Sequence, residues 1–239
     1  MVMAGCGGAP KRQTGSNAPG RVPPPPAASP APEPSPQPPA ATPEATPEPE
    51  ITVAPETKPL YTEVGRASWY GPGFQHRKAA NGELFDMNRL TAAHRTIPLN
   101  SIARVTNVKT GESVLLRITD RGPFVSDRIL DLSRASAQKI SVYKNGGALV
   151  RIEVLRSPAS INTGGKWCVQ IGAFSNAQDA TELKAKITRR YQTARVLQFT
   201  GPEGTSWLRV RVAADDKHRA EELIKETETD AAVFLVRLD

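Results

Sequence analysis

Hydrophobic and polar residues alternate in several short runs in the middle of the chain. The clearest runs are Ile102–Asn107, Val114–Asp120 and Leu149–Leu155, and such alternation is typical of strands with one buried face. Turn signals containing glycine or asparagine separate the runs, and a short helix is expected over Arg134–Lys139. Short strands at intervals of about ten residues, with one short helix, predict a small β-barrel.

The last third of the chain has a mixed pattern. Ala180, Leu183 and Ile187 are spaced by three and four residues, which predicts a helix with one buried stripe. The expected strands are Trp167–Phe174, Arg195–Phe199, Ser206–Val212 and Ala232–Leu238, and the expected helices are Asn176–Tyr191 and His218–Thr227. This βαββαβ order predicts a ferredoxin-like α+β domain.

Alternation also assigns the two faces of this sheet. One set should pack under the helices: Val169, Ile171, Leu208, Val210 and Val212. The other set should lie on an open face: Cys168, Gln170, Trp207, Arg209 and Arg211. Trp and Arg side by side could stack on sugars and bond their hydroxyls. The alternatives are a solvated face or an RNA-binding face, although the aromatic pattern of RNA-binding sheets is absent.

Composition separates these two regions from the N-terminal part of the chain. Of 22 prolines, all but five lie between Pro10 and Pro59. Residues 7–60 lack the apolar content for a core, so we expect a disordered, solvated tether. At ~3.1 Å per residue for polyproline II, it could reach on the order of 150 Å.

Charge and metal-binding residue types narrow the classes of function. The net charge is +7, but Lys and Arg are interspersed with Asp and Glu, so we expect no nucleic-acid partner. The cysteines Cys6 and Cys168 are far apart, as are His76, His94 and His218, so we expect no metal or other cofactor. No apolar run reaches the roughly 20 residues of a membrane span.

The N-terminus contains a candidate lipidation site. Met1–Cys6 resembles the end of a bacterial lipoprotein signal, with small residues before a Cys that becomes acylated, although the charged and apolar regions of a signal peptide are missing. Either the true start lies upstream or Cys6 is an ordinary thiol in a tail. We favour an upstream start, which predicts a lipid anchor at Cys6 in the outer membrane.

Asp120 is the first candidate for chemistry. It ends an apolar strand and is followed by Arg121 and a Gly122-Pro123 turn, which would leave its carboxyl at the rim of a sheet. The alternative is an Asp that caps a turn and pairs with Arg121, since Asp is common in turns for local reasons.

Several ordered motifs carry a specific resemblance. They are Gly65–Tyr70, Ala80–Glu83, Leu90–Thr96, Thr119–Phe124 and Ile129–Ser133. Together they resemble the six-stranded double-psi β-barrel of the rare lipoprotein A family, whose characterised members are bacterial envelope proteins that act as lytic transglycosylases of peptidoglycan. The resemblance implies that Asp120 is the catalytic acid/base and that Glu83 and His94 line the same cleft. The chain departs from the family at Ala79, where relatives tend to carry Thr, so a substrate-facing hydroxyl is missing.

A second resemblance covers the C-terminal domain. The run Val169–Ser175 is similar to the opening of a SPOR domain, and such domains bind glycan strands stripped of their stem peptides and gather at division sites. The resemblances divide the chain into residues 1–6 (signal remnant), 7–60 (tether), 61–156 (catalytic barrel), 157–165 (linker) and 166–239 (SPOR domain). The expected glycan-binding residues are Trp69, Tyr70, Asn81 and Arg121 in the barrel and Gln170, Trp207 and Arg209 in the SPOR domain.

The chemistry limits what Asp120 must do. Most glycosidic hydrolases need two carboxylates, whereas in lytic transglycosylation the sugar's own hydroxyl attacks, so one carboxyl can act as base and as acid. Acting as acid requires a raised pKa, to which a like charge on Glu83 could contribute. His94 could orient a carboxyl or bind sugar, or it could be a structural histidine. Trp69 and Tyr70 could stack on sugar or pack in the barrel.

Together the two resemblances imply an endolytic peptidoglycan lytic transglycosylase that prefers strands without stem peptides and leaves anhydromuramyl ends. We expect it at the division septum, lipid-anchored in the outer membrane and facing the periplasm, with unidentified septal partners. The main alternative is a non-catalytic peptidoglycan-binding envelope lipoprotein. A third possibility is an expansin-like wall-loosening protein.

Overall fold

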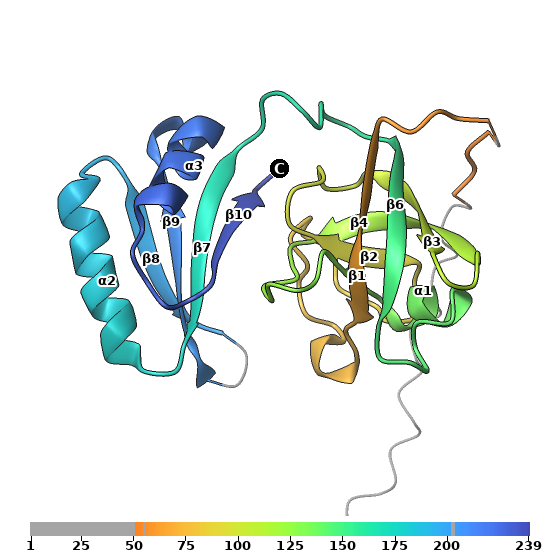
Figure 1. The fold of residues 1–239 in the computed structure, drawn as a ribbon, viewed down its shortest axis with the longest axis horizontal. Helices are drawn as coiled ribbons and strands as arrows, with labels where there is room; N and C mark the ends of the chain where they lie inside the picture. Colours follow the sequence, from red (N-terminus) through yellow and green to blue (C-terminus); the bar gives the residue numbers. More distant parts are fainter. Residues whose placement is uncertain (1–50, 55, 202–203) are drawn as a thin grey trace, which may run out of the picture. The chain divides into compact units, whose positions relative to one another are not determined.

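The alternating runs after residue 60 form a closed barrel in the computed structural model (Figure 1), in the strand order β1-β5-β2-β4-β3-β6. Its strands are β1 (Tyr61–Trp69), β2 (Thr91–His94), β3 (Ile102–Asn107), β4 (Ser113–Asp120), β5 (Leu130–Leu132) and β6 (Ala148–Arg156). The β1–β5 and β2–β4 pairs are parallel, and the other pairs are antiparallel. The six-stranded barrel expected from the sequence is confirmed.

The barrel interior is filled by alternate residues of its strands. In β4, Leu116 and Ile118 are fully buried, and in β5 the same holds for Leu130 and Leu132. A short 3-10 helix, η1 (Pro72–Phe74), follows β1. Helix α1 (Arg134–Lys139) begins after Ser133, whose hydroxyl accepts a hydrogen bond from Ser136 N at 3.1 Å, as an N-cap residue does.

The C-terminal domain is a four-stranded sheet in the order β10-β7-β9-β8. Its elements are β7 (Trp167–Phe174), α2 (Ala177–Arg190), β8 (Arg195–Thr200), β9 (Ser206–Arg211), η3 (Ala213–Asp215), α3 (Lys217–Glu226) and β10 (Val233–Arg237). The buried stripe Ala180, Leu183 and Ile187 of α2 packs against sheet residues that include Val169 and Leu208. The expected βαββαβ order and the helix-facing set of side chains are confirmed.

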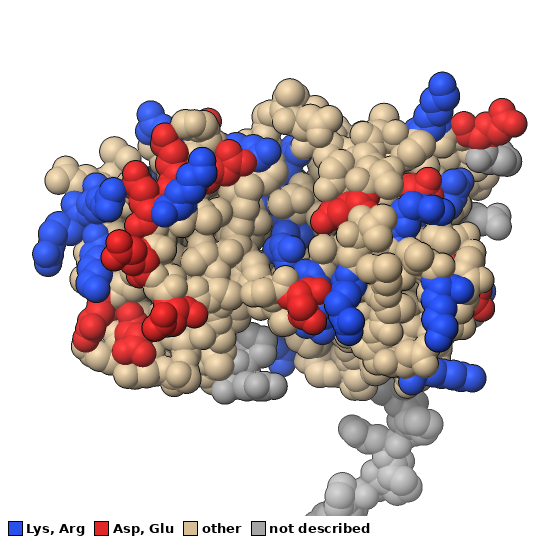
Figure 2. Space-filling view, viewed as in Figure 1, with Lys and Arg blue, Asp and Glu red and all other residues tan. Residues whose placement is uncertain are grey.

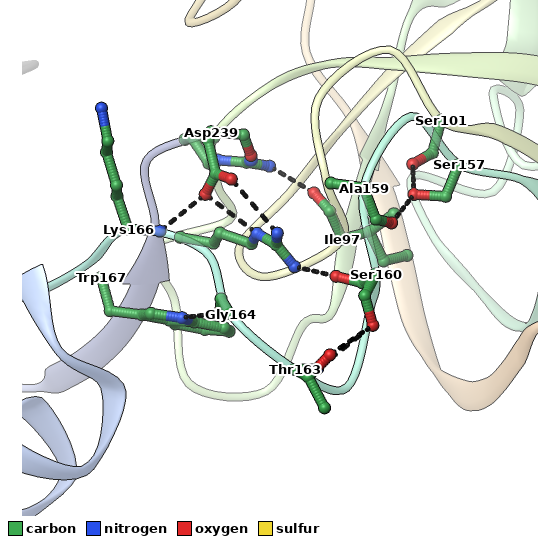
Figure 3. A network of polar contacts seen from close by, with 12 residues as sticks. Ile97, Ser101, Ser157, Ala159, Ser160, Thr163, Gly164, Lys166, Trp167 and Asp239 are labelled. Atoms are coloured by element: carbon green, nitrogen blue, oxygen red, sulfur yellow. Dashed lines mark hydrogen bonds and ion pairs between the residues drawn. The ribbon is translucent and has the colours of Figure 1, made fainter.

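Residues between the two domains are fixed by the end of the chain (Figure 3). The Arg237 guanidinium is buried and donates to Asp239 Oδ1 at 3.0 Å and to Ser160 O at 2.7 Å. The backbone N–H of Lys166 donates to the same Asp239 oxygen at 2.8 Å, and the Trp167 indole donates to Gly164 O at 2.8 Å. These bonds join β7, β10 and the preceding segment.

The structure describes residues 51–54, 56–201 and 204–239, and all of them belong to a single compact unit. Cys6 and nearly all of the expected tether lie outside the described residues. Among the described helices, none combines the length and apolar character needed to span a membrane. On the face drawn in Figure 2, basic and acidic side chains are interspersed.

Candidate active site

Asp120 lies at the end of β4, and its carboxyl is held by two backbone groups. Ala80 N donates to Asp120 Oδ1 at 2.9 Å and Arg121 N donates to the same oxygen at 2.8 Å. The loop that supplies Ala80 is fixed to β4 by a hydrogen bond from Asn81 N to Thr119 O at 3.1 Å. Burial raises the pKa of Asp120, and it outweighs the two N–H groups and Arg121, which lower it. A raised pKa is what an acid catalyst needs at neutral pH.

The hydrogen bonds of the Arg121 guanidinium go to backbone carbonyls and not to the Asp120 carboxyl, with which the alternative would pair it. Its Nη1 donates to His94 O at 3.0 Å and to Ile97 O at 2.7 Å, and its Nη2 donates to Asp239 O at 2.6 Å. Arg95 acts in a similar way, since its Nη1 donates to Pro123 O and Arg128 O at 2.9 and 2.8 Å. These arginines hold the segment after β4 against the end of β2.

A cavity of about 540 Å³ opens beside Asp120. The barrel contributes residues that include Tyr70, Asp120, Arg121, Phe124, Arg128 and Asp131, and the C-terminal domain contributes Gln170, Trp207 and Arg209 among others. Its volume falls within the range of ligand sites, on the order of 300–1,000 Å³. The sequence-derived candidates Tyr70, Asp120, Arg121, Gln170, Trp207 and Arg209 therefore meet at one cavity.

Glu83 lies in a different environment. Its carboxylate forms a bidentate pair with Arg117, at 2.6 and 2.7 Å, and it lines a separate cavity of about 10 Å³ with Ala79. The hydrogen bonds from Arg117 lower the pKa of Glu83. The expected like-charge effect of Glu83 on Asp120 is not what raises the pKa of Asp120, because that cause is burial. Asn81 is engaged locally: its Nδ2 donates to Asn100 Oδ1 at 3.0 Å and its Oδ1 accepts from Glu83 N at 3.1 Å.

The His94 side chain is buried in a hydrogen-bonded network and is not among the residues that line the large cavity. Thr96 N and Ile97 N donate to its Nδ1 at 3.1 and 3.0 Å. The ring proton is therefore assigned to Nε2, which donates to Glu63 Oε2 at 3.1 Å. Burial lowers the pKa of His94, despite the opposing effect of Glu63. This environment is that of the structural histidine considered as an alternative.

The adjacent aromatic candidates Trp69 and Tyr70 have different environments. Trp69 packs against the barrel core, with its ring 4.6 Å from that of Tyr143, which is the packing alternative. Tyr70 stacks on Phe85 at 4.3 Å and lines the large cavity. Burial and the nearby Asp120 raise the pKa of Tyr70, so its hydroxyl stays protonated.

The second face of the C-terminal sheet is only partly open, contrary to the expectation of a fully open face: Arg211 keeps a 41% exposed side chain, whereas the centre of the face is buried. Trp207 and Gln170 are only 7% and 2% exposed. The Phe124 ring lies 5.8 Å from that of Trp207, and Arg95 lies over the Phe234 ring. Apolar contact with Phe124 therefore covers part of this face, and the amide of Gln170 accepts from Arg209 Nη2 at 3.0 Å.

Three residues near the site were not among the candidates predicted from the sequence: Glu63, Arg117 and Asp131. Asp131 carried a usable signal, since it is the polar position between Leu130 and Leu132 and alternation places it opposite the core. The partners of Glu63 and Arg117 depend on strand register, which the sequence does not display. Within the described parts of the chain, no three His, Cys, Asp or Glu side chains group as metal ligands, and Cys168 is a buried free thiol.

The barrel and the sheet domain define the class of protein. The family described as "Lytic transglycolase" matches residues 62–152, and the SPOR domain family matches residues 163–233. The fold and the matches agree on a double-psi β-barrel protein of the lytic transglycolase type with a C-terminal SPOR domain.

Curated relatives identify the family more closely. Three of them, each named endolytic peptidoglycan transglycosylase RlpA, come from Campylobacter jejuni, Neisseria meningitidis and Vibrio cholerae. They are 40%, 53% and 45% identical over 163, 93 and 147 residues, and the alignments cover 58%, 39% and 59% of this chain. These matches confirm the resemblance of the chain to the rare lipoprotein A family.

The extent of these matches is partial. The chain spans 58%, 39% and 56% of the length of those three relatives. A solved expansin from Clavibacter michiganensis gives a TM-score of 0.34 at 14% identity, over 74% of this chain and 86% of the expansin. A likeness of that size gives no support to the expansin alternative.

Proposed function

We propose that the protein is an endolytic lytic transglycosylase that cleaves the glycan strands of peptidoglycan in the cell envelope. The observation that carries this proposal is the Asp120 carboxyl. It is partly buried, its pKa is raised, and it lines a cavity of about 540 Å³. The names of the curated relatives add support for the same activity.

Asp120 transfers protons in this reaction. The C6 hydroxyl of a muramic acid unit attacks its own anomeric carbon, the glycosidic bond breaks, and the leaving oxygen takes up a proton. Both backbone hydrogen bonds of Asp120 go to Oδ1, so we assign proton transfer to Oδ2. General acid/base catalysis of this kind contributes typically about 10²–10⁴-fold.

The proposed substrate is a glycan strand without stem peptides. Trp207, Gln170 and Arg209 of the C-terminal sheet line the same cavity as Asp120. An aromatic face and a guanidinium are suited to sugar rings and their hydroxyls. A strand without bulky peptides would fit this site more easily than a substituted one.

We also propose that the protein is lipid-anchored at Cys6 in the outer membrane and acts from the periplasmic side at the division septum. The lipoprotein-like sequence before Cys6 and the proline-rich tether support the anchor. The SPOR domain match supports association with peptidoglycan.

A second candidate function is a non-catalytic peptidoglycan-binding protein. Two of the three expected catalytic side chains are engaged elsewhere, which favours this alternative. Glu83 is paired with Arg117, and His94 is held by Glu63 and backbone groups. Under this alternative, Asp120 would bind sugar without transferring a proton.

Cleavage of purified stem-peptide-free glycan separates the two functions. The wild-type protein should release shorter strands with anhydromuramyl ends, and Asp120→Asn should lower the rate by at least about 10²-fold while the fold is kept. Tight binding of glycan by well-folded wild-type protein, with no product, would instead support the binding protein.

A further inference from the structure

A glycan strand without stem peptides differs from an intact strand in charge as well as in bulk. In peptidoglycan the stem peptide is attached to the lactyl group of muramic acid through an amide bond. Hydrolysis of that bond removes the peptide and leaves a free carboxylate on the sugar. A site that selects such strands can recognise this new negative charge, and a guanidinium is the side chain best suited to bind a carboxylate.

A cation is needed where this carboxylate would enter the large cavity. The carboxyls of Asp120 and Asp131 line the cavity, and each repels a further anion when it is ionised. The positively charged side chains that line it are Arg121, Arg128 and Arg209. Which of them can take a carboxylate depends on what each guanidinium already binds.

Two of these guanidinium groups, those of Arg121 and Arg209, are already engaged. Arg121 donates to three backbone carbonyls at 2.6, 2.7 and 3.0 Å. Arg209 Nη2 donates to Gln170 Oε1 at 3.0 Å, and the guanidinium carbon lies 5.4 Å from the centre of the Phe199 ring. Bidentate binding of a carboxylate at either group would compete with these contacts.

Arg128 has a fixed backbone and free side-chain donors. Its carbonyl accepts from Arg95 Nη1 at 2.8 Å, and its N–H donates to Val125 O at 3.4 Å. The side chain is only 29% exposed, yet among the described residues the guanidinium donates no hydrogen bond, and its Nε is buried without a partner. Asp131 Oδ1 lies 3.7 Å from that Nε, which is beyond hydrogen-bond distance. A buried donor without an acceptor is unfavourable until a ligand supplies one.

We propose that Arg128 binds the free lactyl carboxylate of the muramic acid unit that is cleaved, and that this contact selects strands without stem peptides. This inference rests on the proposed transglycosylase function. The unpaired N–H groups of the guanidinium form two parallel hydrogen bonds to the carboxylate oxygens. An intact strand presents a neutral amide at the same position, so it lacks both the charge and one of the two acceptor oxygens.

One sugar unit can contact both Asp120 and Arg128. The lactyl group is attached at C3 of the same ring whose anomeric carbon reacts. Asp120 and Arg128 line the same cavity, so a unit with its anomeric carbon at Asp120 brings its lactyl group into the cavity that Arg128 lines. The lactyl group does not react, and Arg128 is therefore a specificity-determining residue.

The competing explanation is that Arg128 only positions the Asp131 carboxyl. The ion-pair contact of 3.7 Å would be the basis of such a role. A positioning residue affects cleavage of every substrate to the same extent. Recognition of the carboxylate affects only substrates that carry the charge, so the two explanations differ in a measurable way.

The test uses the full chain and two forms of purified stem-peptide-free glycan. One form keeps its lactyl carboxylates, and in the other they are converted to methylamides, which removes the charge and adds little bulk. The proteins are wild type, Arg128→Met, Arg128→Lys and a control, Arg151→Met. The Arg151 side chain lies on β6, is 51% exposed and is not among the residues that line the cavity. Met keeps the apolar stem of an arginine and removes only the charged group.

The measured quantity is the ratio of kcat/KM on the carboxylate form to kcat/KM on the methylamide form. We expect a ratio of about tenfold or more for wild type and for Arg151→Met, because a site built to bond a substrate group discriminates against an analogue that lacks it. Arg128→Met should bring the ratio close to one. Arg128→Lys keeps the charge without the planar fork, so its ratio should lie in between.

The outcomes separate this inference from the function on which it rests. A wild-type ratio close to one overturns the inference whether or not the variants fold. An unchanged ratio in folded Arg128→Met overturns it as well, and an equal fall of both rates would make Arg128 a positioning residue for Asp131. If Arg128→Met fails to fold, Arg128→Lys decides, and a wild-type ratio in that variant contradicts the inference. Wild type that cleaves neither form overturns the transglycosylase function itself, and this inference with it.

Discussion

Asp120 is a single residue on which the proposed catalysis and the stability of the fold make opposite demands. Burial raises its pKa, while two N–H groups at 2.8 and 2.9 Å favour the ionised form. Ionisation at neutral pH therefore has a cost in the folded state. Active sites often retain such destabilising groups because function requires them.

The first prediction concerns the stability of Asp120→Asn. Since the folded pKa of Asp120 lies above its unfolded value of about 3.9, its favourable contribution is present at low pH and is lost as the pH rises through the folded pKa. Asn can accept the same N–H groups without a charge. The variant should thus be more stable than wild type at pH 7, with the gap closing towards about pH 3. Urea unfolding of both proteins at the two pH values measures this, and a less stable variant at pH 7 would contradict it.

The ion pair of Glu83 and Arg117 gives a second residue-scale prediction. We expect the pair to position the loop that donates Ala80 N to Asp120. Glu83→Gln and Arg117→Met should each lower kcat/KM for glycan cleavage by less than about tenfold. The kcat/KM of the double variant should be no lower than that of the less active single variant. If the two losses multiply instead, Glu83 acts on the substrate independently of Arg117.

At the scale of elements, the strands β7 and β9 are closely fitted at Gly172. A Cβ at Gly172 would lie 2.6 Å from two Trp207 ring carbons, and the backbone there has a positive φ of 149°. Only glycine fits this approach without strain.

Gly172→Ala should therefore displace Trp207 and weaken binding to stem-peptide-free glycan by about tenfold or more, as loss of a stacked aromatic ring would. Gly73→Ala is the matched control, because nothing lies within 4 Å of a Cβ at Gly73. Binding is measured by pull-down on stripped sacculi. Equal binding by the two variants would place the glycan site away from Trp207.

How far the sequence could predict the structure differs between elements and contacts. The strand Val114–Asp120 and the helix stripe Ala180, Leu183 and Ile187 were predictable, because the spacing of apolar residues within a short stretch of sequence indicates both the element and its buried face. The location of His94 was not, because its partner Glu63 lies on another strand and its Nδ1 bonds depend on the local backbone path. The position of Asp131 opposite Ala93 was not predictable either, because it depends on the register between β2 and β5.

At the scale of the whole molecule, the two domains contribute to one cavity. Asp120 and Tyr70 come from the barrel, and Gln170, Trp207 and Arg209 come from the sheet. The sequence predicted each set but treated the sheet face as open. Contact of the Phe124 ring with the rings of Trp207 and Phe234 explains why part of this face is covered.

Anchoring is the prediction that concerns the complete protein. When an upstream start is restored, we expect Cys6 to become the acylated N-terminal residue of an outer-membrane protein. Mass spectrometry of the mature N-terminus, with and without a lipoprotein signal peptidase inhibitor, measures this. A soluble periplasmic product, or processing that ignores the inhibitor, would contradict it.

The origin of the oxygen at newly formed ends tests the central claim most directly. Purified wild-type protein is incubated with stem-peptide-free glycan in water enriched in heavy oxygen, and the ends are analysed by mass spectrometry. Because the attacking hydroxyl belongs to the sugar, the products should be anhydromuramyl ends without label. Reducing ends that carry the heavy oxygen would mean that water, and not the sugar hydroxyl, supplies the oxygen of the new end, and the protein would then be a hydrolase.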